Sequence, residues 1–317
     1  MIDVLRARRR IAPHVRRTPL VRSTWLSDLA GGDVRLKLES LQVANSFKSR
    51  GAFNAVIARL ERAEGRPRQI VTASAGNHGR GLAAAAQTFA LPLVVFTPAS
   101  APAAKLDAIR RHGADLRATG RDYDDAERMA KTFARETGAE FISPYSDRDV
   151  IDGAATIALE LFEDAPELDT LVVPIGGGGM ISGVGGVAKA INPGIQVVGV
   201  ELEVSHVFQD SLRAGHLVEI EAGESIADGL GGNADPETIT FDLIQRFVDR
   251  IVTVSEDDLE AAIVGLVEKE HLIAEGAGAA ATAAVASRHV DVSDRSVAVI
   301  VSGSNIDRTR LMSVLAT

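Results

Sequence analysis

The chain has 317 residues, of which 46% are hydrophobic and 24% charged, so it is long enough for two globular domains with sizeable cores. Its net charge of -9 disfavours a nucleic-acid partner, and the absence of cysteine excludes disulfides, thiolate metal sites and cysteine nucleophiles. No long apolar run predicts a membrane span, and no apolar segment follows the basic cluster at Arg8 to Arg10 as an export signal requires. We therefore expect a cytoplasmic protein.

Short apolar runs alternate with helical segments along most of the chain. The predicted strands cover 34–38, 69–72, 91–96, a short strand that ends at Leu116, then 171–175, 197–200 and 297–301. The predicted helices cover 49–62, 77–89, 103–112, 122–136 and an alanine-rich, tightly packed segment over 274–286. Apolar strands between helices are typical of parallel sheets that are buried on both faces, so the predicted fold class is α/β.

The first candidate for chemistry is Lys48, at the start of the predicted helix 49–62. The helix end carries partial positive charge, and this field together with local burial would lower the pKa of the Lys48 ammonium. A lysine with a lowered pKa can react with a carbonyl group as a neutral amine. An exposed lysine in a first helical turn would have the same spacing, so the residues alone leave both interpretations open.

The second candidate is the segment Thr72-Ala73-Ser74-Ala75-Gly76-Asn77-His78-Gly79, which follows a strand and opens a helix. Small residues let backbone N–H groups approach a ligand, and a helix start favours an anionic group such as a carboxylate. Asn77 offers both a donor and an acceptor. An ordinary strand-to-helix turn that is capped by Ser74 or Asn77 would explain the segment equally well.

The third candidate is a run of four glycines, Gly176 to Gly179, followed by Met180 after the strand 171–175. Consecutive glycines are costly in chain entropy, and they are expected where backbone amides surround a phosphate at a helix start. The run lacks the Gly-Lys-Ser or Gly-Lys-Thr sequence of a Walker motif. A flexible surface turn is the alternative, but phosphate binding is the strongest physical signal in the chain.

Two further features leave other functions open. Residues 183–188 fit the loose G-x-G-x-x-A dinucleotide pattern, and Glu201 ends the next strand, about where a ribose-binding acid would lie. The first of these glycines falls several residues past the strand end, inside the probable helix, which argues against dinucleotide binding. A nicotinamide oxidoreductase stays open as the weaker alternative. The seven histidines show no metal-ligand spacing, and we predict no metal site.

Two loops complete the set of motifs. Ser302-Gly303-Ser304-Asn305 directly follows the strand 297–301, and Ala227-Asp228-Gly229 belongs to a segment of small residues. Polar residues at the carboxyl end of a parallel strand are well placed to meet a ligand. Each loop alone would be interpreted as a turn.

Together, these segments resemble the threonine/serine dehydratase and serine racemase family, which are fold-type II pyridoxal-phosphate enzymes with a tryptophan synthase β-like fold. The resemblance runs nearly end to end, from Arg17-Thr18-Pro19-Leu20 to Glu275-Gly276-Ala277 and Ser302-Gly303-Ser304-Asn305. It implies pyridoxal 5'-phosphate as cofactor. It also implies a large domain of residues 1–50 and 146–317, a small domain of residues 51–145, and a homodimer.

The resemblance implies a role for each site residue. Lys48 would carry the cofactor through its amine, with Phe47 and Gly229 on the two sides of the pyridine ring. Asn77 would bond the 3-hydroxyl, Ser302 would face the pyridine nitrogen, and Glu275 would also contact the cofactor. The phosphate would be held by Gly176, Gly177, Gly178, Gly179 and Met180. The substrate carboxylate would be bordered by Ser74, Ala75, Gly76, Asn77 and His78.

The chain departs from the family pattern in three respects. Racemases of the family use a serine where this chain has Ala75, which favours elimination over racemisation. Glu201 matches one acid of the family's cation site, but no second acid follows at the usual spacing, so no cation is predicted. The sequence stops at Thr317 without the regulatory domain of biosynthetic threonine dehydratases, and feedback control by isoleucine is not expected.

The resemblance therefore implies an L-threonine/L-serine-type dehydratase, an ammonia-lyase that converts a 3-hydroxy amino acid into a 2-oxo acid and ammonia by α,β-elimination. A neutral Ser302 at the pyridine nitrogen, where a carboxylate would make the ring a stronger electron sink, would favour loss of the β-leaving group over transamination. The alternatives are 3-hydroxyaspartate or phenylserine as substrate, serine racemisation, a nicotinamide oxidoreductase, and a non-catalytic binding protein.

Overall fold

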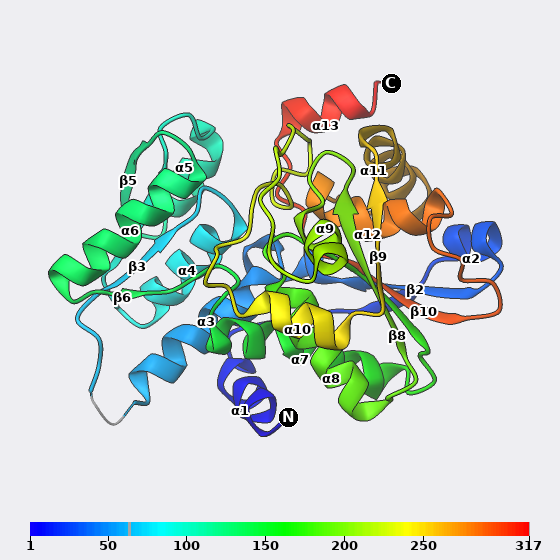
Figure 1. The fold of residues 1–317 in the computed structure, drawn as a ribbon, viewed down its shortest axis with the longest axis horizontal. Coiled ribbons are helices and arrows are strands. Elements are labelled where there is room, and N and C mark those ends of the chain that lie inside the picture. The colour runs from blue at the N-terminus through cyan, green and yellow to red at the C-terminus, as the bar shows by residue number, and fades with distance from the viewer. Residues whose placement is uncertain (63–64, 317) are drawn as a thin grey trace.

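The chain forms two β-sheets, each covered by helices on both faces (Figure 1). The structure, a computed structural model, describes residues 1–62 and 65–316. Residues 63–64, which belong to the predicted small domain, and Thr317, the last residue of the predicted large domain, lie outside the described residues.

The larger sheet has six strands in the spatial order β1-β2-β10-β7-β8-β9. Neighbouring strands run parallel, except that β1 pairs antiparallel with β2. Because β10 lies between β2 and β7, the two ends of the chain meet in the centre of this sheet. The strands are β1 (Leu20–Arg22), β2 (Asp33–Leu38), β7 (Thr170–Pro174), β8 (Gln196–Leu202), β9 (Arg250–Val254) and β10 (Ser296–Val301).

The smaller sheet has four parallel strands in the order β5-β4-β3-β6. They are β3 (Ile70–Ala73), β4 (Leu93–Pro98), β5 (Asp115–Gly120) and β6 (Glu140–Phe141). All four fall inside the predicted small domain. The domain boundaries at residues 51 and 146 stay a prediction.

The helices alternate with these strands, and short polar side chains cap several of their starts. Ser23, Asp122, Asp147, Ser255 and Asp307 each accept a hydrogen bond from a backbone N–H of the first turn. The helices are α1 (Ile2–Ile11), α2 (Thr24–Ala30), α3 (Lys48–Leu60), α4 (Asn77–Thr88), α5 (Ala103–Arg110), α6 (Tyr123–Thr137), α7 (Arg148–Asp164), α8 (Gly179–Ile191), α9 (Val207–Ala214), α10 (Thr240–Phe247), α11 (Glu256–Glu270), α12 (Gly276–Ala286) and α13 (Arg308–Val314), with the 3-10 turns η1 (Glu39–Leu41) and η2 (Val43–Asn45).

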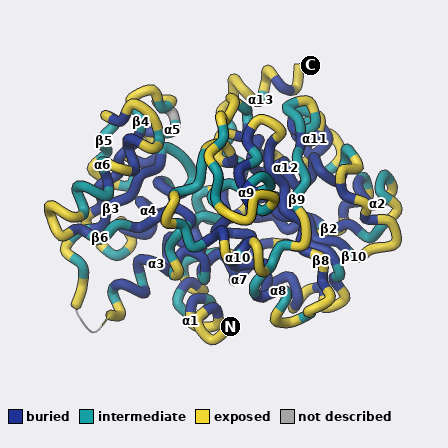
Figure 2. Tube along the Cα trace, viewed as in Figure 1, coloured by how far each residue is buried: buried dark blue, intermediate teal, exposed yellow. Residues whose placement is uncertain are grey.

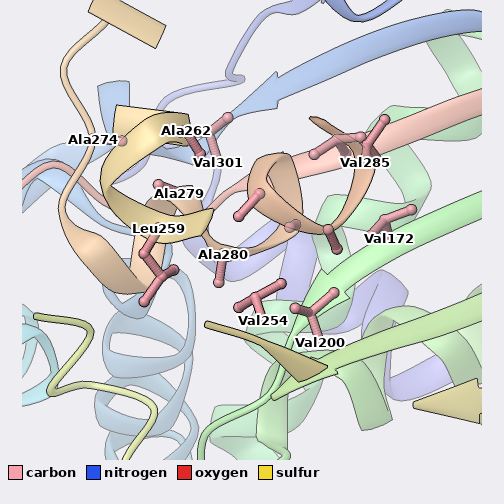
Figure 3. Packing of buried hydrophobic residues seen from close by; sticks show 14 of the residues in the cluster. Val172, Val200, Val254, Leu259, Ala262, Ala274, Ala279, Ala280, Val285 and Val301 are labelled. Atoms are coloured by element: carbon pink, nitrogen blue, oxygen red, sulfur yellow. The ribbon is translucent and has the colours of Figure 1, made fainter. Parts of the chain in front are cut away.

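Helix α12 packs directly on the larger sheet. Figure 3 shows Ala280 of this helix beside Val200 and Val254 of the sheet, and Figure 2 shows α12 as buried. Residues 276–285 are buried on all sides of the helix. A helix that is apolar all round belongs in a core, and alanine lets its backbone approach the sheet closely. The predicted tightly packed helix is confirmed, although it begins at Gly276.

The smaller sheet buries alternate residues on opposite faces, as the period of a strand requires. Ile70 and Val95 belong to the core that α3 and α4 form, whereas Val71 and Phe96 pack with α6 on the other face. Helix α3 also packs on α7 of the larger unit, so it connects the two sheets.

The α/β fold class with parallel sheets flanked by helices is confirmed. The predicted end of a strand at Leu116 is wrong, because β5 begins at Asp115 and continues to Gly120. β5 is an edge strand, and its partly exposed Arg117 and exposed Thr119 interrupt the apolar pattern. Strands β1, β6 and β9 were not predicted, since they are short or carry polar residues.

Within the described part of the chain, no helix is both long enough and apolar enough to cross a lipid bilayer.

Candidate active site

A cavity of about 670 Å³ lies beside the carboxyl ends of strands β3, β7 and β10. Loops at this end of a parallel sheet are the usual ligand-binding elements. Every residue predicted for the site lines this cavity: Phe47, Lys48, Ser74, Ala75, Gly76, Asn77, His78, Gly176, Gly177, Gly178, Gly179, Met180, Gly229, Glu275 and Ser302.

Lys48 is the first residue of α3, and its amine is held inside the cavity wall. Nζ donates a 2.8 Å hydrogen bond to the carbonyl of Pro144 and lies 5.2 Å from the centre of the Phe47 ring. The Lys48 residue as a whole is half-buried, but its ammonium group is closely surrounded by protein atoms. This burial lowers the pKa of the ammonium to about 8. A useful fraction of neutral amine therefore exists near physiological pH.

The backbone around Lys48 is fastened to the end of β10. The N–H of Phe47 donates to the carbonyl of Ser302 at 3.0 Å, and Ser46 pairs with Gly303 as an isolated β-bridge. The N–H of Lys48 donates to Oγ of Ser46 at 3.2 Å. These contacts hold Lys48 and Ser302, which are distant in sequence, in one wall of the cavity.

A buried cluster of charged side chains stabilises α3 just beyond Lys48. Its members are far apart in sequence, so no local pattern indicates it. Arg50 donates to Glu39 at 2.8 and 2.9 Å and to Glu160 at 2.7 and 2.9 Å, and Lys37 donates to Glu160 at 2.6 Å. Burial opposes ionisation of Glu160, but its hydrogen bonds with Arg50 and Lys37 outweigh this and keep its pKa below the usual value. The charges balance within the cluster, which ties α3 to β2, η1 and α7.

Ser74 organises the loop between β3 and α4. Its Oγ accepts hydrogen bonds from the N–H groups of Gly76 at 3.2 Å and of Gly79 at 3.0 Å. Ser74 therefore bonds the first turn of α4, although the cap position itself is Gly76, which makes no side-chain cap bond. The same loop also lines the cavity.

His78 is buried beneath this loop. Burial, together with the positive charge of Lys48, lowers the pKa of His78 to about 3, so its imidazole is neutral. The nearby carbonyl of Ile142 partly offsets the fall in the pKa of His78. It does not form a hydrogen bond with the ring, and neither ring nitrogen has a partner among the described residues.

Asn77 is the first residue of α4, and its amide is bonded on both sides. Nδ2 donates to Oε1 of Glu275 at 2.6 Å, and Oδ1 accepts from Nδ2 of Asn305 at 2.7 Å. Burial raises the pKa of Glu275 to about 7, although the hydrogen bond from Asn77 favours the ionised form.

The glycine run forms the start of α8. Gly178 precedes the helix with φ +83°, and no side chain caps the first turn. A side chain on Gly177 would overlap the ring of Tyr145, and a Cβ on Gly178 would lie 2.6 Å from Cδ1 of Ile244. The backbone N–H groups of an uncapped helix start can receive an anion, and here that helix start lies at the cavity wall.

Ser302 and Gly229 complete the wall. Oγ of the buried Ser302 donates to the carbonyl of Ala277 at 3.2 Å. A Cβ on Gly176 would lie 2.6 Å from the carbonyl oxygen of Gly229, so the two glycine-containing loops touch.

Two residues that carry no local sequence signal support this part of the cavity. Tyr145 lines the cavity, and its hydroxyl accepts from the N–H of Asp235 at 3.0 Å. Thr240 donates to the carbonyl of Gly177 at 2.9 Å and so braces the glycine run. Tyr145 is the last residue of the predicted small domain, and it was not predicted as a site residue.

The rival dinucleotide motif has a packing explanation. Gly183 lies within α8, where a Cβ would be 2.6 Å from the carbonyl oxygen of Ile151 in α7. Glu201 accepts from the N–H groups of Phe208 and Gln209 at 2.9 and 2.8 Å, which caps α9. These residues therefore serve helix packing and capping.

No group of three or more metal-ligating His, Cys, Asp or Glu side chains occurs within residues 1–62 and 65–316.

Comparison with known proteins decides the family. The family model described as pyridoxal-phosphate dependent enzyme matches residues 11–303. The chain belongs to this family. The predicted family and the predicted pyridoxal-phosphate cofactor are confirmed.

Two curated relatives of this pyridoxal-phosphate-dependent enzyme resemble it over most of their length. An L-threonine ammonia-lyase of Thermotoga maritima is 42% identical over 96% of this chain and 75% of its own. A catabolic L-threonine dehydratase of Staphylococcus aureus is 36% identical over 99% of this chain and 91% of its own.

Solved structures agree with the fold. Maize serine racemase superposes with a TM-score of 0.92 at 33% identity and covers 99% of this chain and 96% of its own. The processed form of threonine deaminase isoform 2 from Solanum lycopersicum superposes with a TM-score of 0.91 at 31% identity and covers 99% of this chain and 91% of its own.

The cavity of this pyridoxal-phosphate-dependent enzyme fits its cofactor. Lys48 would offer a buried amine to the aldehyde, and the uncapped start of α8 would offer backbone donors to the phosphate. Both groups line one cavity, so the residues present are those that such a cofactor needs.

Proposed function

We propose that this enzyme is an L-threonine/L-serine-type dehydratase, which removes water and then ammonia from a 3-hydroxy amino acid and leaves a 2-oxo acid. The observation that carries the proposal is that a buried amine with a lowered pKa shares its cavity with an uncapped, glycine-rich helix start. The ammonia-lyase class agrees with the names of both curated relatives.

Each part of the cofactor has a partner in the cavity. Lys48 would bind it covalently, and the backbone from Gly176 to Met180 would hold its phosphate. Asn77 would bond its 3-hydroxyl, Ser302 would face its ring nitrogen, and Phe47 and Gly229 would lie on its two sides. When bound, pyridoxal phosphate withdraws electrons from the substrate Cα and so makes the Cα–H bond acidic.

Lys48 is also the base in the proposed mechanism. Nζ of Lys48, in its neutral form, would take the Cα proton of the bound substrate. The 2.8 Å hydrogen bond to the Pro144 carbonyl holds Nζ at the cavity wall. The lowered pKa of His78 keeps its imidazole neutral, so it adds no competing positive charge beside the amine.

The substrate carboxylate would bind at the loop between β3 and α4. The helix start offers partial positive charge, and Ser74 fixes the loop by accepting from Gly76 and Gly79. The loop thereby orients the substrate above Lys48 without a charged side chain of its own.

An assay with a panel of 3-hydroxy amino acids tests the proposal. Holo-protein should release 2-oxo acid from L-threonine and L-serine, and Lys48→Ala should abolish this release. Lys269→Ala, a change of an exposed lysine, should leave the rate unchanged. The proposal is wrong if no member of the panel reacts, or if Lys48→Ala keeps the wild-type rate.

Ala75 distinguishes elimination from racemisation. It lines the cavity in the loop that would face the substrate, and its methyl group cannot exchange a proton. Ala75→Ser should introduce measurable racemisation of L-serine, which chiral chromatography of the residual substrate would detect. If the variant gains no racemase activity, the proposed position of this residue opposite Lys48 is wrong.

The proposal includes three finer statements: serine as a second substrate, a homodimer, and a cytoplasmic location. Sedimentation of the purified holo-protein tests the dimer, and a monomer at all concentrations would remove that part of the proposal.

A further inference from the structure

Asn305, outside the proposed set of cofactor contacts, lies beside Asn77 in the cavity wall. Its side-chain amide makes two hydrogen bonds in which the donor and the acceptor are unambiguous. Its Nδ2 donates to the backbone carbonyl of Ala44 at 2.9 Å, and its Oδ1 accepts from the guanidinium of Arg80. A carbonyl oxygen can only accept and a guanidinium can only donate, so the Asn305 amide has one allowed orientation.

The orientation of Asn305 determines that of Asn77. The second hydrogen on Nδ2 of Asn305 points to Oδ1 of Asn77 at 2.7 Å, which leaves Nδ2 of Asn77 to donate to Glu275 at 2.6 Å. Rotation of the Asn77 amide by half a turn would place two N–H groups against each other. One N–H of Asn77 remains available for a ligand in the cavity.

The turn that anchors Asn305 is conformationally constrained. Ala44 and Asn45 both have left-handed backbones, with φ of 55° and 58°. In this conformation the Ala44 carbonyl reaches Asn305, and the Asn45 carbonyl accepts from the N–H of Ser304 at 2.9 Å. Non-glycine residues keep such conformations where the surrounding contacts enforce them. The same turn leads directly into Ser46 and Lys48.

We propose that Asn305 is a positioning residue, which fixes the Asn77 amide so that one N–H is aimed at the 3-hydroxyl group of the cofactor, with Arg80 anchoring Asn305. This inference rests on the proposed function, because the orientation of Asn77 matters for catalysis if the cofactor lies beside it. Asn305 acts through Asn77 and needs no contact with the cofactor itself.

Asn305→Asp is the most direct perturbation. The two side chains are nearly the same size, and the carboxylate still accepts from Arg80, but it cannot donate to Ala44 or Asn77. The Asn77 amide can then rotate to donate toward residue 305. We expect the dissociation constant of pyridoxal phosphate to rise roughly tenfold, since one oriented hydrogen bond is lost, and the visible absorbance maximum of the holo-protein to move.

The control is Asn192→Asp, the same change at the end of α8. Asn192 accepts from Gly194 and donates to the carbonyl of Leu168, so its bonding pattern is similar, but it does not line the cavity. This variant should bind the cofactor with wild-type affinity and spectrum.

A double-mutant cycle separates positioning from general structural support. In an Asn77→Ala background, Asn305→Asp should have no further effect on cofactor affinity or on the absorbance maximum, because there is no amide left to orient. Arg80→Met should give a smaller change in the same direction, about threefold, and should also be silent in that background. Arg80 is half-buried, so this second variant keeps the inference testable if Asn305→Asp does not fold.

Two results would overturn the inference. One is wild-type affinity and spectrum in folded Asn305→Asp, or in Arg80→Met if the first variant does not fold. The other is an effect that persists undiminished in the Asn77→Ala background. A wild-type protein that binds no pyridoxal phosphate and releases no 2-oxo acid would instead contradict the proposed function.

Discussion

Lys48 is the residue on which the proposed chemistry depends, and its environment predicts a specific pH dependence. Burial lowers the pKa of its ammonium from the usual 10.5 to about 8, so the reactive neutral amine accumulates as the pH rises through 8. The rate at which apo-protein captures pyridoxal phosphate should therefore rise with pH and level off above about pH 8. The growth of visible absorbance after mixing measures this rate.

A free lysine derivative that is mixed with the same cofactor provides the reference profile. Its rate should keep rising toward pH 10, because its ammonium is fully solvated. The assignment of the lowered pKa would be wrong if protein and free lysine gave the same profile.

At the residue scale, the sequence is most informative where the type of a residue by itself indicates which ligand it can bind. The glycine run is a local signal that predicts a phosphate site by itself, whereas Lys48 was singled out only by the family resemblance, because its spacing alone also fits an exposed lysine. The partners of Asn77 could not be predicted. Glu275 and Asn305 reach Asn77 through α12 and β10, and no local pattern encodes such long-range pairing.

At the scale of elements, the start of α8 combines a left-handed residue with close packing. Gly178→Ala should lower both the melting temperature and the affinity for pyridoxal phosphate, because the added Cβ meets Ile244 and shifts the helix start. Thermal unfolding and a cofactor titration measure the two effects.

Gly215→Ala is the matched control for Gly178→Ala. Gly215 has a similar φ of +79°, but a Cβ there would meet no atom within 4 Å. This variant should be destabilised by about 1 kcal/mol, because alanine is strained in the left-handed backbone conformation. It should bind the cofactor normally. Equal cofactor affinity in the two variants would contradict the role of the glycine run.

The strands and helices that sequence patterns predicted best are the buried ones, such as β7, β8 and α12, where apolar residues are nearly continuous. Edge strand β5 was placed wrongly because one side meets solvent. The charged cluster of Arg50, Glu39 and Glu160 was missed because its members look like surface residues until the fold brings them together.

At the scale of the molecule, ion pairs join the smaller sheet's helices to the loop between α9 and α10. Lys131 of α6 pairs with Asp235, and Lys105 of α5 pairs with Asp228. Residues of this loop line the cavity, so the pairs hold one of its walls. The two-domain arrangement that we propose would make them contacts across the cleft.

Lys131→Met should loosen this wall and raise KM for the amino acid more than it lowers kcat. A partly exposed ion pair contributes about 1 kcal/mol, which corresponds to a roughly fivefold change in KM. Lys269→Met, at an exposed site that lies outside the cavity, is the control for the loss of one charge. Steady-state kinetics with L-threonine would make the comparison, and an unchanged KM in Lys131→Met would contradict the proposed contact.

The central claim is that Lys48 carries the cofactor, and borohydride reduction of the holo-protein tests it most directly. Reduction makes the bond between amine and cofactor permanent, and peptide mass spectrometry then locates it. We predict a pyridoxal-phosphate adduct on the peptide that contains Lys48 and none in Lys48→Ala. An adduct on a different lysine of the wild-type protein, with Lys48 unmodified, would contradict the account.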